Sequence, residues 1–268
     1  MENAKKKKKS AAMRSEARWA YLFIAPTMIG LIILNFYPII STIIESFYRT
    51  KGLTGSQFVG FQNYLNVWAN PMFQLGLKNT FELSLICSPL LWFLSFLFAM
   101  LLSRIRPAGG FFRSSVLMPY LMPSSAVLIV WLLWFDYGGP VNHLMHLMGM
   151  ARVSWLRSSE LRVPVVLMFL WKNLGFCVVI FTAALQAIPE SLYEYATLEG
   201  ANFRQQAFQI TLPLIVPSAF LVLILTWVNA FKIFKEVYFI GGSYPDEPVY
   251  TLQNYMNNMY GKLNYQNV

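Results

Sequence analysis

The chain has 268 residues, of which 56% are hydrophobic and only 12% charged, and its mean hydropathy is +0.47. Soluble domains carry about 25% charged residues, so this composition excludes an ordinary soluble globular protein. The net charge of +9 does not indicate a nucleic-acid partner, because its densest part, the lysine run 5–9 with Arg14 and Arg18, precedes the first apolar stretch. Basic residues beside a membrane span mark its cytoplasmic side, with some attraction to anionic lipid.

Five long apolar stretches follow the basic segment, and each is near or above the ~20 residues that cross a hydrocarbon core as a helix. They cover residues 19–44, 83–103, 114–135, 163–189 and 205–231, and only the fourth contains a charge, Lys172. Backbone in lipid must satisfy its own hydrogen bonds, which leaves helices or closed barrels. Barrel strands would alternate, so the sequence predicts an all-α polytopic membrane protein. We expect a basic cytoplasmic tail over 1–18, a membrane domain over 19–240 and an extracytoplasmic tail over 241–268.

The apolar stretches argue against a cleaved secretory signal and against a cysteine-based site. Stretch 19–44 is too long for the apolar part of a secretory signal and is followed by no small-residue cleavage site, so we expect it to be retained. Cys87 and Cys177 lie inside predicted spans and form neither a disulfide framework nor a CxxC metal motif. Pro119 and Pro123 are expected to kink stretch 114–135, because proline removes a backbone donor.

His143 and His146, the two histidines of the chain, are three residues apart in the connection 136–162. They could form half of a metal site, but no carboxylate accompanies them, and scattered loop histidines are the favoured interpretation. The sequence contains no nucleophile elbow and no HExxH motif. We therefore expect neither a metal site nor a catalytic site.

Polar side chains at membrane depth are costly, and this makes them candidates for function. Lys172 and Asn173 lie well inside the fourth stretch. Lys172 could line a solute pathway, but it could also extend its ammonium toward the membrane surface or pair with a carboxylate such as Glu82. Both alternatives stay open on the sequence alone.

The fifth stretch carries a second polar group, Thr226, Trp227 and Asn229. An aromatic plane beside hydrogen-bonding groups suits a sugar, although tryptophan is also common at membrane interfaces. Lys232 and Glu236 have i,i+4 spacing and are expected to form a local pair near the outer boundary.

Between the fourth and fifth stretches, residues 190–213 resemble two short amphipathic helices joined by a glycine. Ser191 and Glu194 have the spacing of a capping box, and Asn202 and Gln205 can start a second helix in the same way. Gly200 can close the first helix in a left-handed conformation. The segment could lie on the membrane, but with little basic charge it better suits a groove on a soluble partner.

The same segment, "EYATLEGANFRQQAFQITLP", resembles the EAA loop of the membrane subunits of binding-protein-dependent ABC importers. The pattern is E-A-A, three residues, G, nine residues, I-x-L-P, and the residues that fall on it are Glu194, Ala196, Gly200, Ile210, Leu212 and Pro213. Tyr195 departs from it, where alanine is usual. "YLFIAPTMIGLIILNFYPI", "FVGFQNY", "MPYLMPSSAVLIVWLLWFD", "WKNLGF" and "LQAIPESLYEYA" are similar to the carbohydrate-type permeases, the group that includes maltose and glycerol-3-phosphate importers.

The resemblance implies the transmembrane domain of a type I ABC importer in a bacterial plasma membrane. It assigns coupling to an ATPase to Glu194, Tyr195, Ala196, Leu198, Gly200, Ile210, Leu212 and Pro213. The chain has no GxxxxGK[ST] motif, so ATP and magnesium are expected on a partner, with no cofactor on this chain. The implied partners are a second permease subunit, an ABC ATPase dimer, an external solute-binding protein and a sugar. Lys172, Asn173, Trp227 and Asn229 are the candidate pathway residues.

Members of that family end with another membrane helix after the segment matching "YGKLNYQNV", and we expect that helix to be missing from this sequence. Its absence keeps a second interpretation open, a non-transporting scaffold that anchors an ATPase. A membrane-embedded enzyme is the third, and it is disfavoured because Lys172 is the clear mid-depth charge of the five stretches.

Overall fold

The computed structural model describes residues 2–50, 55–104 and 109–264, and the chain divides into two compact units between Val67 and Trp68. Residues 105–108 of the expected inside turn, residues 265–268 of the tail and the side chains of the lysine run lie outside the described part. Five helical segments within it are long and apolar enough to cross a membrane. They are Glu16–Glu45, Pro71–Ser103, Ser124–Leu147, Arg162–Gln186 and Phe203–Gly241.

The first unit begins with a long helical segment. Helix α1 (Glu2–Leu31) continues through a π-helical turn (Ile32–Phe36) into α2 (Tyr37–Glu45). Pro26 is accommodated inside α1, and Pro38 lies in the first turn of α2, where its missing N–H costs least. The large apolar side chains from Trp19 to Ile44 are mostly exposed within the unit, as a lipid-facing span requires.

A short hairpin follows, formed by β1 (Tyr48–Thr50) and β2 (Ser56–Phe58), which pair antiparallel with Tyr48 opposite Phe58. Helix α3 (Gln62–Trp68) then carries the buried Asn63. The Asn63 amide donates to the carbonyl oxygens of Ser46 (2.8 Å) and Tyr48 (2.9 Å). It therefore satisfies the backbone at the point where α2 gives way to the hairpin.

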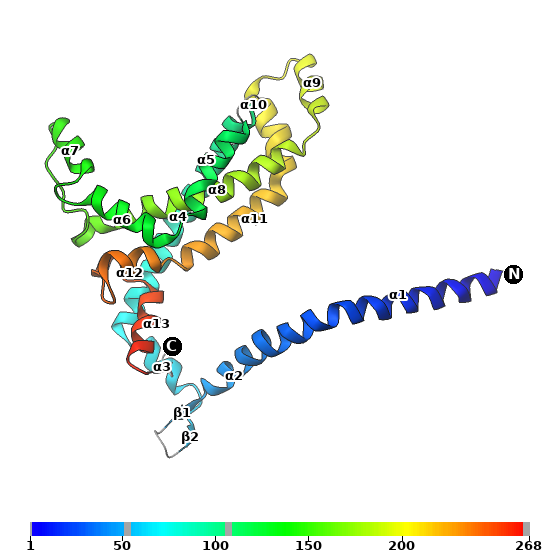
Figure 1. The fold of residues 1–268 in the computed structure, drawn as a ribbon, viewed down its shortest axis with the longest axis horizontal. Helices are drawn as coiled ribbons and strands as arrows, with labels where there is room; N and C mark the ends of the chain where they lie inside the picture. The colour runs from blue at the N-terminus through cyan, green and yellow to red at the C-terminus, as the bar shows by residue number, and fades with distance from the viewer. Residues whose placement is uncertain (1, 51–54, 105–108, 265–268) are drawn as a thin grey trace. The chain divides into compact units, whose positions relative to one another are not determined.

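The second unit is built on three helices that pack together, α4 (Pro71–Arg104), α8 (Arg162–Gln186) and α11 (Leu212–Phe231) (Figure 1). Their shared core is apolar, and its fully buried members include Leu83, Leu91, Val178, Phe181 and Val222. Helix α5 (Gly109–Leu121) packs on α8. Gly175 permits this approach, because a Cβ there would lie 2.6 Å from the carbonyl carbon of Val116.

The third apolar stretch does not form one kinked helix, so that prediction is wrong. Helix α5 ends at Leu121, and α6 (Ser124–Phe135) starts anew after Pro123, whose ψ of 130° is extended rather than helical. Pro123 offers no N–H to continue the ladder, whereas Pro119 is accommodated inside α5. Helix α7 (Pro140–Leu147) follows in the connection, before a 3-10 turn (Ser158–Leu161).

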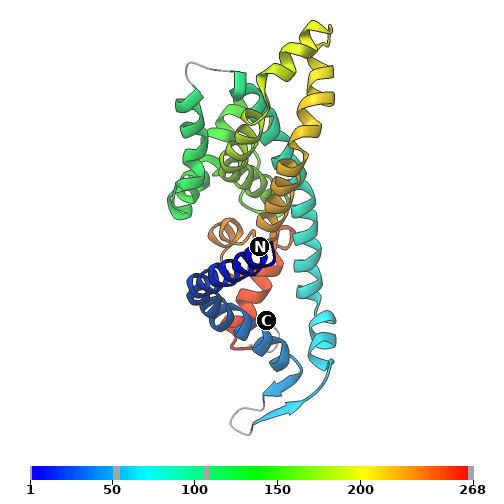
Figure 2. The same cartoon turned by 90° about the vertical axis from the view of Figure 1, so that its right-hand side faces the viewer.

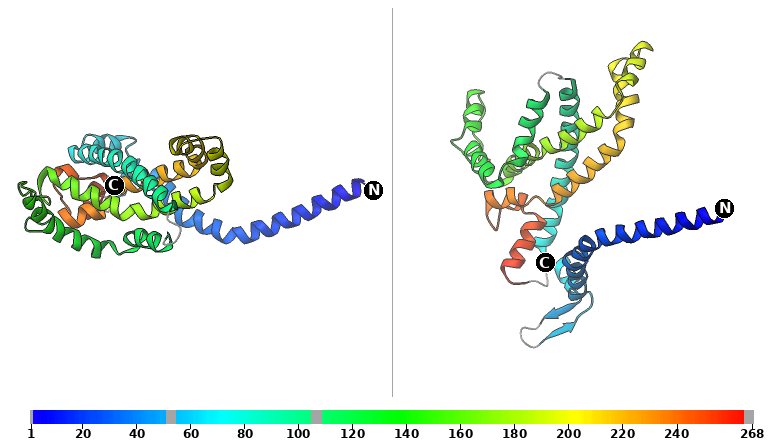
Figure 3. Two further views of the ribbon diagram at one scale, coloured as in Figure 1. Left: turned by 90° about the horizontal axis from the view of Figure 1, so that it is seen from above. Right: turned by 45° about the vertical axis from the view of Figure 1, so that its right-hand side comes forward.

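The C-terminal segment is folded rather than loose. Helix α12 (Lys235–Gly241), a 3-10 turn (Glu247–Val249) and α13 (Leu252–Gly261) follow α11, and α13 packs along the start of α4 (Figure 3). The buried Asn79 of α4 donates to the carbonyl oxygens of Glu247 (2.6 Å) and Tyr250 (2.9 Å). These bonds fasten the segment between α12 and α13 to the membrane helices.

Arg162 reinforces the same junction from the first turn of α8. Its guanidinium donates to the Pro248 carbonyl (2.7 Å) and to the Asn79 side-chain oxygen (2.9 Å). It also forms an ion pair with Glu82 (2.8 Å). The C-terminal segment is thus held by α4 and α8 together.

Candidate functional site

Two regions at opposite ends of α11 concentrate polar and exposed side chains. Helix α9 (Glu190–Leu198) and the short α10 (Phe203–Gln205) connect α8 to α11 at one end, and α12 leaves from the other (Figure 2). Because α8 and α11 run antiparallel through the core, the α9–α10 connection projects beyond the packed helices. The pocket described below lies at the α12 end.

The α9–α10 connection is ordered by its own hydrogen bonds. Gly200 adopts a φ of +80°, which favours glycine, and its predicted role as the helix terminator is confirmed by the bond from the Ala201 N–H to the Ala196 carbonyl (2.9 Å). The capping box at Asn202 is confirmed too. The Asn202 oxygen accepts from the Gln205 N–H (3.0 Å), and the Gln205 side chain accepts from the Asn202 N–H (2.8 Å).

The capping box predicted at Ser191 and Glu194 is wrong. Helix α9 begins two residues earlier than this box requires, at Glu190 after Pro189 with ψ of 130°, and no side chain caps it. The extended Pro189 sets the start of the helix instead. A bond between the hydroxyls of Tyr193 and Thr211 (2.9 Å) then ties α9 to the π-helical turn (Gln206–Thr211) that leads into α11.

The residues expected to couple to an ATPase lie along this connection. Glu194, Tyr195, Leu198, Gly200 and Pro213 are exposed, and Ala196, Ile210 and Leu212 are half-buried. The exposed apolar side chains are large: Leu198 is 84% exposed and Tyr195 67%. An ordered backbone therefore presents apolar side chains that this chain leaves uncovered, and their role stays a prediction.

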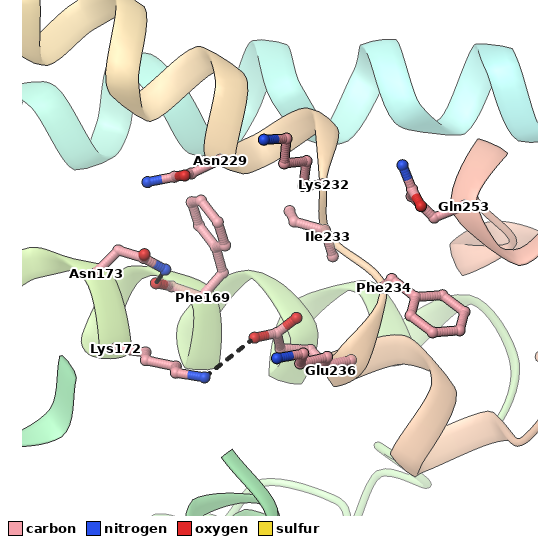
Figure 4. A pocket seen from close by; sticks show the side chains of 10 residues that line it. Phe169, Lys172, Asn173, Asn229, Lys232, Ile233, Phe234, Glu236 and Gln253 are labelled. Atoms are coloured by element: carbon pink, nitrogen blue, oxygen red, sulfur yellow. Dashed lines mark hydrogen bonds and ion pairs between the residues drawn. The ribbon is translucent and has the colours of Figure 1, made fainter. Parts of the chain in front are cut away.

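The second region is an open pocket of about 540 Å³, within the roughly 300–1,000 Å³ typical of small-molecule sites. Its lining comes from α8, α11, α12 and α13 (Figure 4). The lining residues are Phe169, Lys172, Asn173, Asn229, Lys232, Ile233, Phe234, Lys235, Glu236 and Gln253. Three of the four candidate pathway residues, Lys172, Asn173 and Asn229, thus meet at one pocket, although they lie on two helices.

Lys172 is held by two partners from other elements. Its ammonium donates to the hydroxyl of Ser124 at the start of α6 and lies 3.8 Å from the Glu236 carboxylate of α12. The side chains of Lys172 and Glu236 are only 16% and 11% exposed. A largely buried charge needs such a counter-ion, since isolated burial is very costly.

This arrangement corrects two expected pairs. Glu82 is not the partner of Lys172, because it pairs with Arg162 and with Lys78 (3.8 Å). Lys232 does not pair with Glu236 either. The helix ends at Phe231, and Phe234 has a φ of −143°, so the i,i+4 geometry is lost. The signal that could have found the pair was Glu236, the one acidic residue of the short charged segment that follows the fifth stretch.

Of the remaining polar candidates in the spans, one lines the pocket and two do not. The Asn173 amide donates to the Phe169 carbonyl (2.8 Å), which leaves its oxygen free to accept. Trp227 is not among the lining residues, and its ring lies against Phe231 (6.1 Å between centroids). Thr226 is buried and bonded to Ser88 of α4 (2.7 Å), so it joins two helices.

A metal centre finds no support in the part of the chain that the structure describes. No three His, Cys, Asp or Glu side chains gather there in a way that could hold a metal ion. His143 and His146 lie exposed on α7.

Residues 92–262 match the family described as "Binding-protein-dependent transport system inner membrane component". The chain belongs to this family. It is therefore a multi-pass membrane permease subunit of a transport system and not an enzyme, as the sequence predicts.

Curated relatives extend the similarity over most of the permease. This chain is 31% identical over 244 residues to the sulfoquinovosyl glycerol transport system permease protein SmoG of Agrobacterium fabrum. The match covers 89% of this chain and 79% of the relative. The chain is 30% identical over 233 residues to the trehalose/maltose transport system permease protein MalF of Thermococcus litoralis, covering 86% and 79%.

A solved structure shares the fold. It is a bacterial ABC transporter involved in the import of the acidic polysaccharide alginate, with a TM-score of 0.81 at 22% identity over 94% of this chain and 88% of that one. Together with the family match, this shared fold confirms the expected transmembrane domain of a type I ABC importer.

Proposed function

We propose that this permease is one membrane subunit of an ATP-driven importer that carries a saccharide delivered by an external binding protein. The observation that carries the proposal is the pocket between α8, α11 and α12, where amides, two phenylalanine rings and charged groups surround one volume. Amide side chains can donate to and accept from sugar hydroxyls, and apolar ring faces suit the C–H face of a sugar. The relatives named for sulfoquinovosyl glycerol and trehalose/maltose transport support a saccharide.

The α9–α10 connection serves, in this proposal, as the docking element for a separate ATPase that binds ATP and magnesium. Leu198 and Tyr195 would enter a groove on that subunit, as helices with exposed apolar anchors commonly do. The bonds that close α9 at Gly200 and start α10 at Asn202 make the connection stiff enough to transmit movement to α11. Nucleotide-driven movement then shifts the membrane helices between two states.

The basic tail before the first span supports a cytoplasmic N-terminus in this proposal. Four spans then put α9 on the cytoplasmic side, in reach of an ATPase, and the fifth puts α13 on the outer side, in reach of a binding protein. The host membrane is a bacterial plasma membrane. A second permease subunit would complete the pathway, since the pocket is open rather than enclosed.

The test compares two exposed leucines. Leu198→Asp places a charge at the proposed docking surface, and Leu65→Asp does the same on α3, where Leu65 is 61% exposed. We expect Leu198→Asp to lower the amount of ATPase that co-purifies with the permease at least about tenfold, because burying an unpaired charge costs more than 1.4 kcal/mol. Leu65→Asp should leave it unchanged. Equal retention in both variants would refute docking through α9.

A further inference from the structure

We infer that the pocket selects an anionic saccharide, one that bears a carboxylate, sulfonate or phosphate group. The inference rests on the proposed saccharide function and narrows it to a substrate class. It follows from which charges of the pocket are already neutralised and which are not.

The lining contains three lysines and one glutamate, Lys172, Lys232, Lys235 and Glu236, so its net charge is +2 (three minus one). The charge of Lys172 is already compensated, because its ammonium pairs with the Glu236 carboxylate and donates to the Ser124 hydroxyl. Neither Lys232 nor Lys235 forms an ion pair with any residue that the structure describes. The excess positive charge therefore resides on these two.

The two lysines are placed where a ligand would meet them. Lys232 caps the end of α11, and Lys235 begins α12, on either side of the non-helical turn between the two helices. Figure 4 shows Lys232 near Asn229 and Phe169, on the side of the pocket away from the pair of Lys172 and Glu236. An anion bound at Lys232 would leave the sugar ring within reach of the Asn229 amide and the Phe169 ring (Figure 4).

Other ligand classes fit less well. A cationic solute would be repelled by the net charge of the lining, and like charges disfavour binding. A neutral sugar would use the amides and rings but would leave both ammonium groups without a counter-charge. An anionic saccharide uses the amides, the rings and the ammonium groups together. Its bonds to the ammonium groups are the strongest of these, since charge-assisted hydrogen bonds are roughly twice as strong as neutral ones.

The experiment measures uptake by the complete transporter, reconstituted in proteoliposomes with its ATPase, second permease and binding protein. The probes are sugars that differ only by a carboxylate: galactose with galacturonate, and cellobiose with cellobiouronate. Wild type is compared with the double variant Lys232→Gln/Lys235→Gln and with Lys262→Gln, which removes one lysine outside the pocket lining. The binding protein is the same throughout. Its own selectivity therefore cancels when the uptake rate of each variant is divided by the uptake rate of wild type.

We expect uptake of the acidic sugars to fall about tenfold or more in the double variant, since one charge-assisted bond is worth at least that factor. Neutral-sugar uptake should change less than about twofold, and Lys262→Gln should match wild type. Two outcomes overturn the inference while the proposed function stands: uptake of neutral sugars alone by wild type, or an equal fall for both members of a pair, which would give the lysines a structural or lipid-facing role. If wild type takes up no sugar of either kind, the proposed function fails as well.

Discussion

Breaking the pair of Lys172 and Glu236 tests how the pocket is held together. At 3.8 Å, two unit charges attract by about 4 kcal/mol at an effective dielectric constant near 20. Both side chains are largely buried, so salt screens them little. Removing one partner also leaves the other charge buried and uncompensated. Together these effects predict that Lys172→Met or Glu236→Gln lowers the free energy of unfolding by roughly 3–5 kcal/mol.

A double-mutant cycle separates the pair from its surroundings. The double variant Lys172→Met/Glu236→Gln should be destabilised by less than the sum of the single variants, because it leaves no lone charge. Lys78→Met is the matched control, since Lys78 also lies 3.8 Å from a carboxylate but is 71% exposed. Its loss should cost only about 0–1 kcal/mol. The assay is unfolding by SDS titration in mixed micelles, and additive single-variant effects with a coupling below about 0.5 kcal/mol would refute the reasoning.

Three further predictions concern the second unit. Gly175→Ala should destabilise the protein by about 1–3 kcal/mol or more by forcing α5 away from α8; wild-type stability in the same titration would contradict the close approach. Asn79→Ala should cost roughly 1–3 kcal/mol, because it removes the Asn79 donor from the Tyr250 carbonyl, while the Glu247 carbonyl keeps the Tyr250 N–H. It should also speed amide exchange over residues 247–255, and unchanged exchange would show that other contacts hold the segment. Burial raises the pKa of Tyr250, which lies beyond the spans, above its ordinary value of 10.0. The folded state thus keeps this proton more tightly than the unfolded state, so the stabilisation is complete below about pH 10 and is lost as the pH rises through the raised pKa. Tyr250→Phe should make the decline of stability above pH 10 shallower, and an identical pH profile would refute this.

The features that the sequence predicts correctly are those that depend on local chemistry. The apolar stretches, the left-handed Gly200 and the capping box at Asn202 each depend on residues within a few positions of one another. The third stretch shows the limit of this reasoning, since Pro119 and Pro123 look alike in sequence. One is accommodated in α5 and the other ends the helical conformation. Which proline breaks a helix depends on the packing around it.

The pocket depends on contacts that no local pattern contains. Lys172 meets Ser124 and Glu236, which lie far from it in the chain and are brought together when α6 and α12 pack. The i,i+4 rule favours Lys232 for Glu236, but it applies only within a continuous helix, and α11 ends at Phe231. Trp227 has the right chemistry for a sugar, yet the rotation of α11 places it beside Phe231 rather than in the pocket lining.

The most direct test of the account is ATP-dependent uptake of the acidic and neutral sugar pairs into proteoliposomes that hold the complete transporter. We predict uptake that requires ATP and the binding protein and that stops in Leu198→Asp, while Leu65→Asp transports like wild type. A stable complex of this chain with its ATPase that hydrolyses ATP but moves no sugar would contradict the account and would identify the chain as a scaffold.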